Sequence, residues 1–291
     1  MVKMHYLKDA FATAILLVFG VAPVSALQLQ GDQVTAQDVS DVTAAKPGQT
    51  FTLGVLFKMK PEWHIYWHNP GDSGLATSVS FELPEGLEAG PVLWPAPTRF
   101  MQPGDILGYG YEHSVLLAAK VRVAEDFAGA TNIPIHAKTR WLSCKDVCVP
   151  GRADLEWNLP VSDSPETDNT ELFTGWEKSL PVEAFSAKVE ASTAGELPSD
   201  GSQGEFTITL KFKSAPERVK WFPYSDRSLR VSDAKVEVEG DRADIRFEAS
   251  LLKGHTLSSN DLPVVVTYKE PDGAQRAIRV AVPLKGKGSV R

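Results

Sequence analysis

Long hydrophobic runs, basic clusters and cysteines are all scarce in this 291-residue sequence. Beyond Leu27 no stretch approaches the roughly 18 consecutive apolar residues of a membrane-spanning helix, so we expect the chain after this point not to span a membrane. Acidic residues outnumber basic ones, 37 to 30, and no basic block or basic-aromatic stripe is present. This charge pattern argues against nucleic acid as a partner. The two cysteines can form a single disulfide.

The first 26 residues have the layout of a secretory signal peptide. Lys3 and Lys8 come first, an apolar stretch follows from Ala10 to Val24, and Val24-Ser25-Ala26 fits a small-residue cleavage site. The apolar stretch is about 15 residues, shorter than the ~20 that cross a bilayer. We therefore expect cleavage after Ala26 and export to the periplasm, an oxidising compartment in which disulfides persist. The alternative is an uncleaved N-terminal anchor.

Period-two alternation of apolar and polar residues recurs along the chain, with Gly, Pro, Asn and Asp between the alternating segments. Such alternation is typical of β-strands with one buried face. Helical periodicity is rare, and only the segment from Glu171 to Leu180, followed by Pro181, predicts a short helix. The sequence therefore predicts an all-β protein with two immunoglobulin-like β-sandwich domains in tandem. The clearest predicted strands are residues 50–57, 114–121, 206–212, 243–249 and 262–268.

The composition changes between residues 160 and 204, in polar segments rich in turn-forming residues that begin at Pro160 and at Ser192. Such segments are typical of connections between domains. We therefore place a linker in this region, at residues 161–181. The first domain then spans residues 27–160 and holds both cysteines, and the second spans residues 182–291.

Cys144 and Cys148 form a C-x-x-x-C element with apolar residues on both sides. As a structural brace their disulfide would contribute little, because the chain-entropy model gives about 2 kcal/mol for a loop of ~5 residues, against ~3 for 15. A ring this short is also expected to be strained and easier to reduce, which favours an exchange centre. Lys145 would favour a thiolate and Asp146 would oppose it. The spacing leaves redox and structural roles open, with metal ligation the weaker alternative.

The segment from Trp63 to Gly74 is unusually aromatic and ends in turn residues. In a strand His64, Tyr66 and His68 would share one face, and with two thiolates they could form a nitrogen and sulfur site for Cu(I) or Zn(II). The simpler interpretation is that the aromatic residues pack the sandwich and the histidines lie at a solvated strand end. We follow it and predict no metal site.

Four motifs occur in the order of a known family: Tyr66–Gly74, Trp94–Pro97, Gly108–Tyr111 and Trp141–Pro150. Together they resemble the N-terminal periplasmic region of the DsbD and ScsB thiol:disulfide interchange proteins. The ScsB branch is the more similar, because it has the same short Cys-Lys-x-x-Cys-x-Pro element. The resemblance covers most of residues 40–160. In the second half it rests mainly on Trp221–Tyr224.

The resemblance implies an immunoglobulin-like domain whose cysteine pair accepts reducing equivalents from a membrane-linked electron carrier and passes them to thioredoxin-fold partners. Cys144 and Cys148 carry over as the catalytic pair, and Cys148 as the cysteine that forms the mixed disulfide. In the family an aromatic cap loop shields the cysteines. Phe100 is the candidate cap residue in this chain, and Tyr66 would line the same site. The resemblance implies no cofactor.

Family members continue into a multi-spanning membrane domain and a thioredoxin-like domain, whereas this sequence stops at Arg291. We therefore expect a stand-alone module that receives electrons from a separate protein, as one component of a protein-disulfide reductase. The ScsB resemblance also suggests a role in copper tolerance. The rival hypothesis is a non-enzymatic periplasmic binding module for a protein partner or copper, with the disulfide as a local brace.

Overall fold

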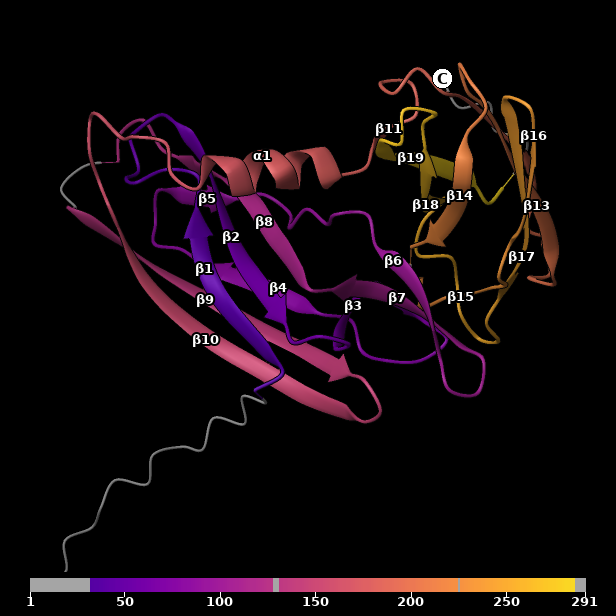
Figure 1. Cartoon of the computed structure of the whole chain (residues 1–291), viewed down its shortest axis with the longest axis horizontal. Coiled ribbons are helices and arrows are strands. Elements are labelled where there is room, and N and C mark those ends of the chain that lie inside the picture. The colour runs from indigo at the N-terminus through magenta and orange to yellow at the C-terminus, as the bar shows by residue number, and fades with distance from the viewer. Residues whose placement is uncertain (1–31, 128–130, 225, 286–291) are drawn as a thin grey trace, which may run out of the picture.

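The computed structural model describes residues 32–127, 131–224 and 226–285. The expected signal peptide, residues 1–26, lies outside the described residues. The chain forms two β-sandwiches joined by one short helix, which confirms the predicted all-β fold with two immunoglobulin-like domains (Figure 1). No helix among the described residues is long and apolar enough to cross a membrane.

Two antiparallel sheets make up the first sandwich. One has the order β1-β2-β8-β5 and the other β10-β9-β3-β7-β6, with β4 also pairing with β9. The strands of the first sheet are β1 (Val34–Ser40), β2 (Thr50–Met59), β5 (Leu87–Ala89) and β8 (Ser114–Val123). Those of the second are β3 (His64–Gly71), β4 (Ser78–Glu82), β6 (Thr98–Gln102), β7 (Ile106–Glu112), β9 (Asn132–Cys144) and β10 (Cys148–Pro160).

Alternating side chains of the two sheets fill this first core. Val55 and Phe57 of β2 are fully buried and pack with Trp67 of β3 and Tyr109 of β7. The same period-two pattern identifies β2 and β8 in the sequence, and both predicted strands are found. The core thus fixes β3 and β7 side by side, with their other faces directed away from it.

The predicted helix is α1 (Thr170–Ser179), within one residue of the expected bounds. It packs on the outer face of the β1-β2-β8-β5 sheet, where Phe173 and Trp176 contact Leu116 and Ala118. Lys120 of the same sheet forms an ion pair with the helix at Glu177, at 3.1 Å. The segment that follows the first sandwich is therefore anchored on it.

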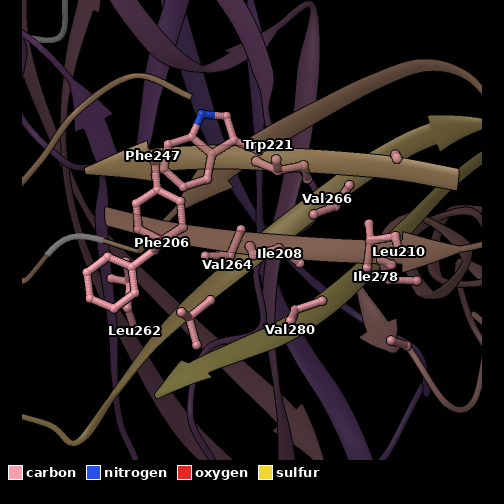
Figure 2. Close-up of a cluster of buried hydrophobic side chains, with 14 of the residues drawn as sticks. Phe206, Ile208, Leu210, Trp221, Phe247, Leu262, Val264, Val266, Ile278 and Val280 are labelled. Atoms are coloured by element: carbon pink, nitrogen blue, oxygen red, sulfur yellow. The ribbon is translucent and has the colours of Figure 1, made fainter. Parts of the chain in front are cut away.

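A second pair of sheets forms the C-terminal sandwich, with orders β11-β19-β18-β14 and β12-β13-β17-β15, and with β16 pairing with β17. Its core holds Phe206 and Phe247, whose rings stack at 5.3 Å, beneath Trp221 (Figure 2). The strands are β11 (Val182–Glu183), β12 (Glu190–Gly195), β13 (Gly204–Lys211), β14 (Glu217–Pro223), β15 (Leu229–Val231), β16 (Lys235–Glu239), β17 (Arg242–Leu251), β18 (Asp261–Lys269) and β19 (Gln275–Pro283).

One part of the composition argument was wrong. The polar segment that begins at Ser192 starts inside β12 rather than in a linker. β12 is an edge strand whose side chains alternate between half-buried and exposed, so one of its faces tolerates Ser, Thr and Glu. Its composition therefore resembles that of a loop.

The two sandwiches share apolar contacts. Val264, Val265 and Val266 of β18 are all fully buried, although they alternate between the two faces of their sheet. Val264 and Val266 belong to the second core, whereas Val265 and Phe222 pack with the aromatic residues of the first sandwich. A continuous buried run of this kind marks a strand that is covered on both faces. The second sandwich thus lies directly against β3 and β7.

Candidate functional site

The cysteine pair closes the hairpin between β9 and β10. Cys144 ends β9, Cys148 begins β10, and the two lie opposite each other in the strand register and are joined by a disulfide. Their exposure differs sharply, because Cys144 is 1% exposed whereas Cys148 lies in the exposed class. A partner approaching from solvent therefore meets Cys148 first.

Local hydrogen bonds hold the tip of this hairpin. The backbone N–H of Lys145 donates to the carbonyl of Val147 at 3.2 Å, and the Ser143 hydroxyl donates to the carbonyl of Val149 at 3.0 Å. The Lys145 ammonium pairs with Glu62 at 2.5 Å, and this hydrogen bond raises the pKa of Lys145. The lysine charge next to the disulfide is therefore already neutralised by a carboxylate.

Tyr66 of β3 contacts the buried sulfur. Its hydroxyl donates to the Sγ of Cys144 at 3.2 Å and accepts from the Nε2 of Gln102 at 2.8 Å. The side chain is fully buried. Burial raises the pKa of the Tyr66 phenol, and the hydrogen bond from Gln102 opposes this shift. The phenol therefore stays protonated and can act as a hydrogen-bond donor to Cys144 over the physiological pH range.

His64 and Phe100 cover the same place. His64 lies opposite Cys144 in the register of β3 and β9, and its ring lies 5.3 Å from that of Tyr66. The ring of Phe100, from the edge strand β6, packs against His64 with a centroid distance of 4.0 Å and the ring planes tilted by 43°. Burial lowers the pKa of His64 to about 4, so the imidazole is neutral at pH 7. The buried side of the disulfide is therefore lined by uncharged rings.

Two glycines make room for these rings. A Cβ on Gly108 of β7 would lie 2.2 Å from the ring of Phe100, and a Cβ on Gly74 would lie 2.4 Å from the ring of Tyr66. Since such distances are far below van der Waals contact, any side chain at either position would displace an aromatic ring. Because Gly108 has no side chain, the ring of Phe100 on β6 can cross over β7 and contact β3.

The four predicted site residues lie together, but the histidines do not lie at a solvated strand end as expected, because His64 is buried and His68 is half-buried. Cys144, Tyr66 and Phe100 are joined by direct contacts, with His64 between them. The ring of His68 instead packs 4.0 Å from Tyr224 of the second sandwich. In the parts of the chain that the structure describes, no group of three or more His, Cys, Asp or Glu side chains is arranged to hold a metal ion.

Neither the hydrogen bond from Gln102 to Tyr66 nor the ring contact between His64 and Phe100 was predicted from the sequence. A signal for Gln102 was available, because it follows Phe100 by two residues in a strand and must share its face. The contact between His64 and Phe100 links strands that are not neighbours in their sheet, and no local pattern reports it.

Three exposed apolar side chains are sequence neighbours of site residues. Val147 is 64% exposed and precedes Cys148, Met101 is 55% exposed and follows Phe100, and Leu75 is 64% exposed and follows Gly74. They make up half of the six large apolar residues that are exposed in the described segments. We call Leu75, Met101 and Val147 the apolar rim.

Comparison with known proteins identifies the first sandwich. Residues 30–160 match a family model described as "Thiol:disulfide interchange protein DsbD, N-terminal". The first sandwich is similar to this family over its whole length. The match contains all four sequence motifs and both cysteines of the disulfide. Family and disulfide together assign this DsbD-type domain to the thiol–disulfide exchange modules.

Solved structures extend the likeness to both sandwiches. The N-terminal periplasmic domain of ScsB from Proteus mirabilis aligns with 88% of this chain and 95% of its own, at 17% identity and a TM-score of 0.62. This similarity shows a shared fold over most of the chain. The N-terminal domain of DsbD from Neisseria meningitidis in the reduced form aligns with 45% of this chain and 90% of its own, at 13% identity and a TM-score of 0.25. A search of curated proteins found no match.

Proposed function

We propose that this protein is a periplasmic thiol–disulfide exchange module that works after removal of residues 1–26 as a signal peptide. The DsbD-type domain, residues 27–160, would pass reducing equivalents between a membrane-linked electron carrier of the DsbD/ScsB type and thioredoxin-fold partners. Residues 161–181 connect it to the second domain, residues 182–291. The observation that carries the proposal is the asymmetric disulfide, with Cys148 exposed and Cys144 buried under an aromatic cap.

The exchange proceeds through a mixed disulfide on Cys148. A thiolate of the reduced donor attacks the Sγ of Cys148, the Cys144–Cys148 bond breaks, and Cys144 leaves as a thiolate. The second donor thiolate then attacks the donor sulfur, forms the donor disulfide and releases Cys148. Two electrons and two protons pass to the cysteine pair, and the reverse sequence reduces an oxidised partner.

Tyr66 is proposed to stabilise the buried leaving group. A thiolate on Cys144 is nearly excluded from water, and an unpaired buried charge is costly. The Tyr66 hydroxyl, at 3.2 Å, is a donor aimed at this sulfur, and Gln102 holds the hydroxyl from the other side. Hydrogen bonds to charged groups are stronger than neutral ones, so this contact strengthens as the disulfide opens.

Phe100 is proposed to limit exchange with unrelated thiols. Its ring covers His64 beside Cys144, so a partner must move β6 to reach the buried side of the disulfide. Val147 of the apolar rim supports a protein partner, because it provides exposed apolar contact area next to Cys148 that a small thiol cannot use. An apolar surface around the partner's own cysteines would contact this region and displace Phe100 from its place beside Cys144.

The reduction potential of the cysteine pair tests the proposed function. Equilibration with defined thiol/disulfide buffers, followed by mass spectrometry of alkylated thiols, measures it directly. We expect a value between roughly −270 and −120 mV, in the range of exchange proteins. A value below about −300 mV would identify a structural bond and favour the binding-module hypothesis instead.

A further inference from the structure

The second domain contacts both strands of the cap hairpin, β6 and β7. On β7, the ring of Tyr109 lies 5.3 Å from Phe222 of β14. On β6, Arg99 pairs with Asp233, a residue 134 positions away in the second domain. Arg99 and Tyr109 are directly opposite each other in the register of the hairpin. One cross-strand pair of the hairpin is therefore held from outside the DsbD-type domain. Figure 1 shows β6 and β7 on the side of the first sandwich that faces the second.

The ion pair has a directional, two-point geometry. The guanidinium Nη1 and Nη2 of Arg99 donate to the two carboxylate oxygens of Asp233 at 3.0 and 2.7 Å. Asp233 is in turn fixed by the indole N–H of Trp221 at 3.3 Å and by the backbone N–H of Ala234 at 2.9 Å. Burial opposes ionisation of Asp233, but hydrogen bonds from Arg99 and Trp221 outweigh it and lower its pKa. The carboxylate is thus a fixed acceptor on a rigid sandwich.

Arg99 and Phe100 are consecutive residues of an extended strand, so their side chains point to opposite faces. Phe100 faces His64 and the cysteine pair, and Arg99 faces the second domain. β6 is the edge of its sheet and pairs only with β7. Holding Arg99 therefore restrains the one strand that carries the cap.

We propose that the second domain is an anchor for the cap, and that the Arg99–Asp233 pair controls how often Phe100 leaves its place against His64 and Tyr66, beside Cys144. This inference rests on the proposed function: attack is on the exposed Cys148, and opening of the cap admits solvent to Cys144, the sulfur that leaves as a thiolate. A partly exposed ion pair contributes modestly, so its removal should raise the open population about two- to fivefold. The side chains of Arg99 and Asp233 are 32% and 45% exposed, which places the pair in this class.

The test compares the rate at which excess dithiothreitol reduces the disulfide in four forms of the full chain. Asp233→Asn keeps an oxygen for Trp221 and Ala234 but removes the charge, and Arg99→Gln removes the other partner. Glu82→Gln is the control, because it removes a surface ion pair, to Lys138 at 2.5 Å, on a strand outside the cap. We expect the two cap variants to be reduced about two- to fivefold faster and the control to match wild type.

A Phe100→Ala background separates anchoring from a general loss of stability. Without the cap ring, Asp233→Asn should give no further acceleration. If dithiothreitol reduces the disulfide of the wild type at a measurable rate, then equal rates for Asp233→Asn, Arg99→Gln and wild type would overturn the anchor. Acceleration by Asp233→Asn that persists in the Phe100→Ala background would also overturn it.

Hydrogen exchange at the β6–β7 pairing gives a readout that does not need redox chemistry. Asp233→Asn should speed exchange of the amides that join Phe100 to Gly108, and unchanged protection there would also overturn the anchor. If the disulfide resists dithiothreitol in every variant while this exchange becomes faster, the proposed function fails and the anchor stands.

Discussion

Burial of His64 predicts that acid destabilises the protein through the candidate site itself. The pKa of His64 falls from 6.5 to about 4 because burial penalises the imidazolium. Between pH 6.5 and 4, His64 is therefore protonated in the unfolded chain but remains neutral in the folded protein. The contribution of His64 to stability is fully present above about pH 6.5 and is lost as the pH falls toward 4.

The magnitude follows from the two pKa values. Between pH 7 and pH 5, a group with pKa 6.5 in the unfolded state and about 4 in the folded state lowers the free energy of unfolding by about 2 kcal/mol. His64→Phe keeps an aromatic ring against Phe100 and removes the titrating group. The loss of stability between pH 7 and pH 5 should therefore shrink by about 2 kcal/mol in this variant.

Urea unfolding at the two pH values measures this difference. His255→Phe is the control, because it makes the same substitution at an exposed loop position of the second domain. His68, whose pKa burial lowers to about 3, provides an internal comparison, and His68→Phe should show an effect of the same sign. An identical pH dependence in His64→Phe and wild type would refute the argument that His64 is buried in the neutral form.

Three further predictions concern the exchange reaction. Tyr66→Phe removes the hydrogen-bond donor to the Cys144 thiolate, so reduction by dithiothreitol should become about tenfold slower or more, because a hydrogen bond to a charged group is lost. Stopped-flow assays measure this rate, and an unchanged rate would exclude this role for Tyr66. Val147→Asp should lower kcat/KM for a thioredoxin-fold partner several-fold but leave the dithiothreitol rate within about twofold, and equal losses with both would argue against rim contacts. Cys144→Ser should accumulate a mixed disulfide with that partner, visible by mass, whereas Cys148→Ser should not; the opposite pattern would reverse the assignment of the two cysteines.

Local sequence patterns predict the fold because burial in each sandwich follows the period of its strands. The alternation at residues 50–57 and 206–212 identifies β2 and β13 in the structure. β12 was not predicted as a strand, because an edge strand needs only one weakly apolar face. The buried run Val264–Val266 did contain information about the second interface, since both of its faces are apolar, but the sequence does not say what covers the second face.

Most of the candidate site could be proposed from motifs, whereas the contacts that link its parts could not. Tyr66, Phe100 and the cysteine pair lie in three segments, and each carries a recognisable motif or a position relative to one. Hydrogen bonds such as Tyr66 to Cys144 join residues 78 positions apart, and the Arg99–Asp233 pair joins residues 134 apart. Such pairs depend on how strands are ordered in the sheets, which local periodicity does not specify.

The arrangement around Cys144 explains how one site can combine shielding with reactivity. Cover by neutral rings would by itself make a leaving thiolate costly, because an unpaired buried charge is strongly disfavoured. The Tyr66 hydroxyl offsets this cost at the buried sulfur, while Cys148 keeps the attacked sulfur in solvent. Since the cover and the donor come from different strands, β6 and β3, the cap can move without displacing Tyr66 itself, although the hydrogen bond from Gln102 of β6 to the Tyr66 hydroxyl is then lost. Opening is then controlled at β6, where the second domain makes its contact through Arg99.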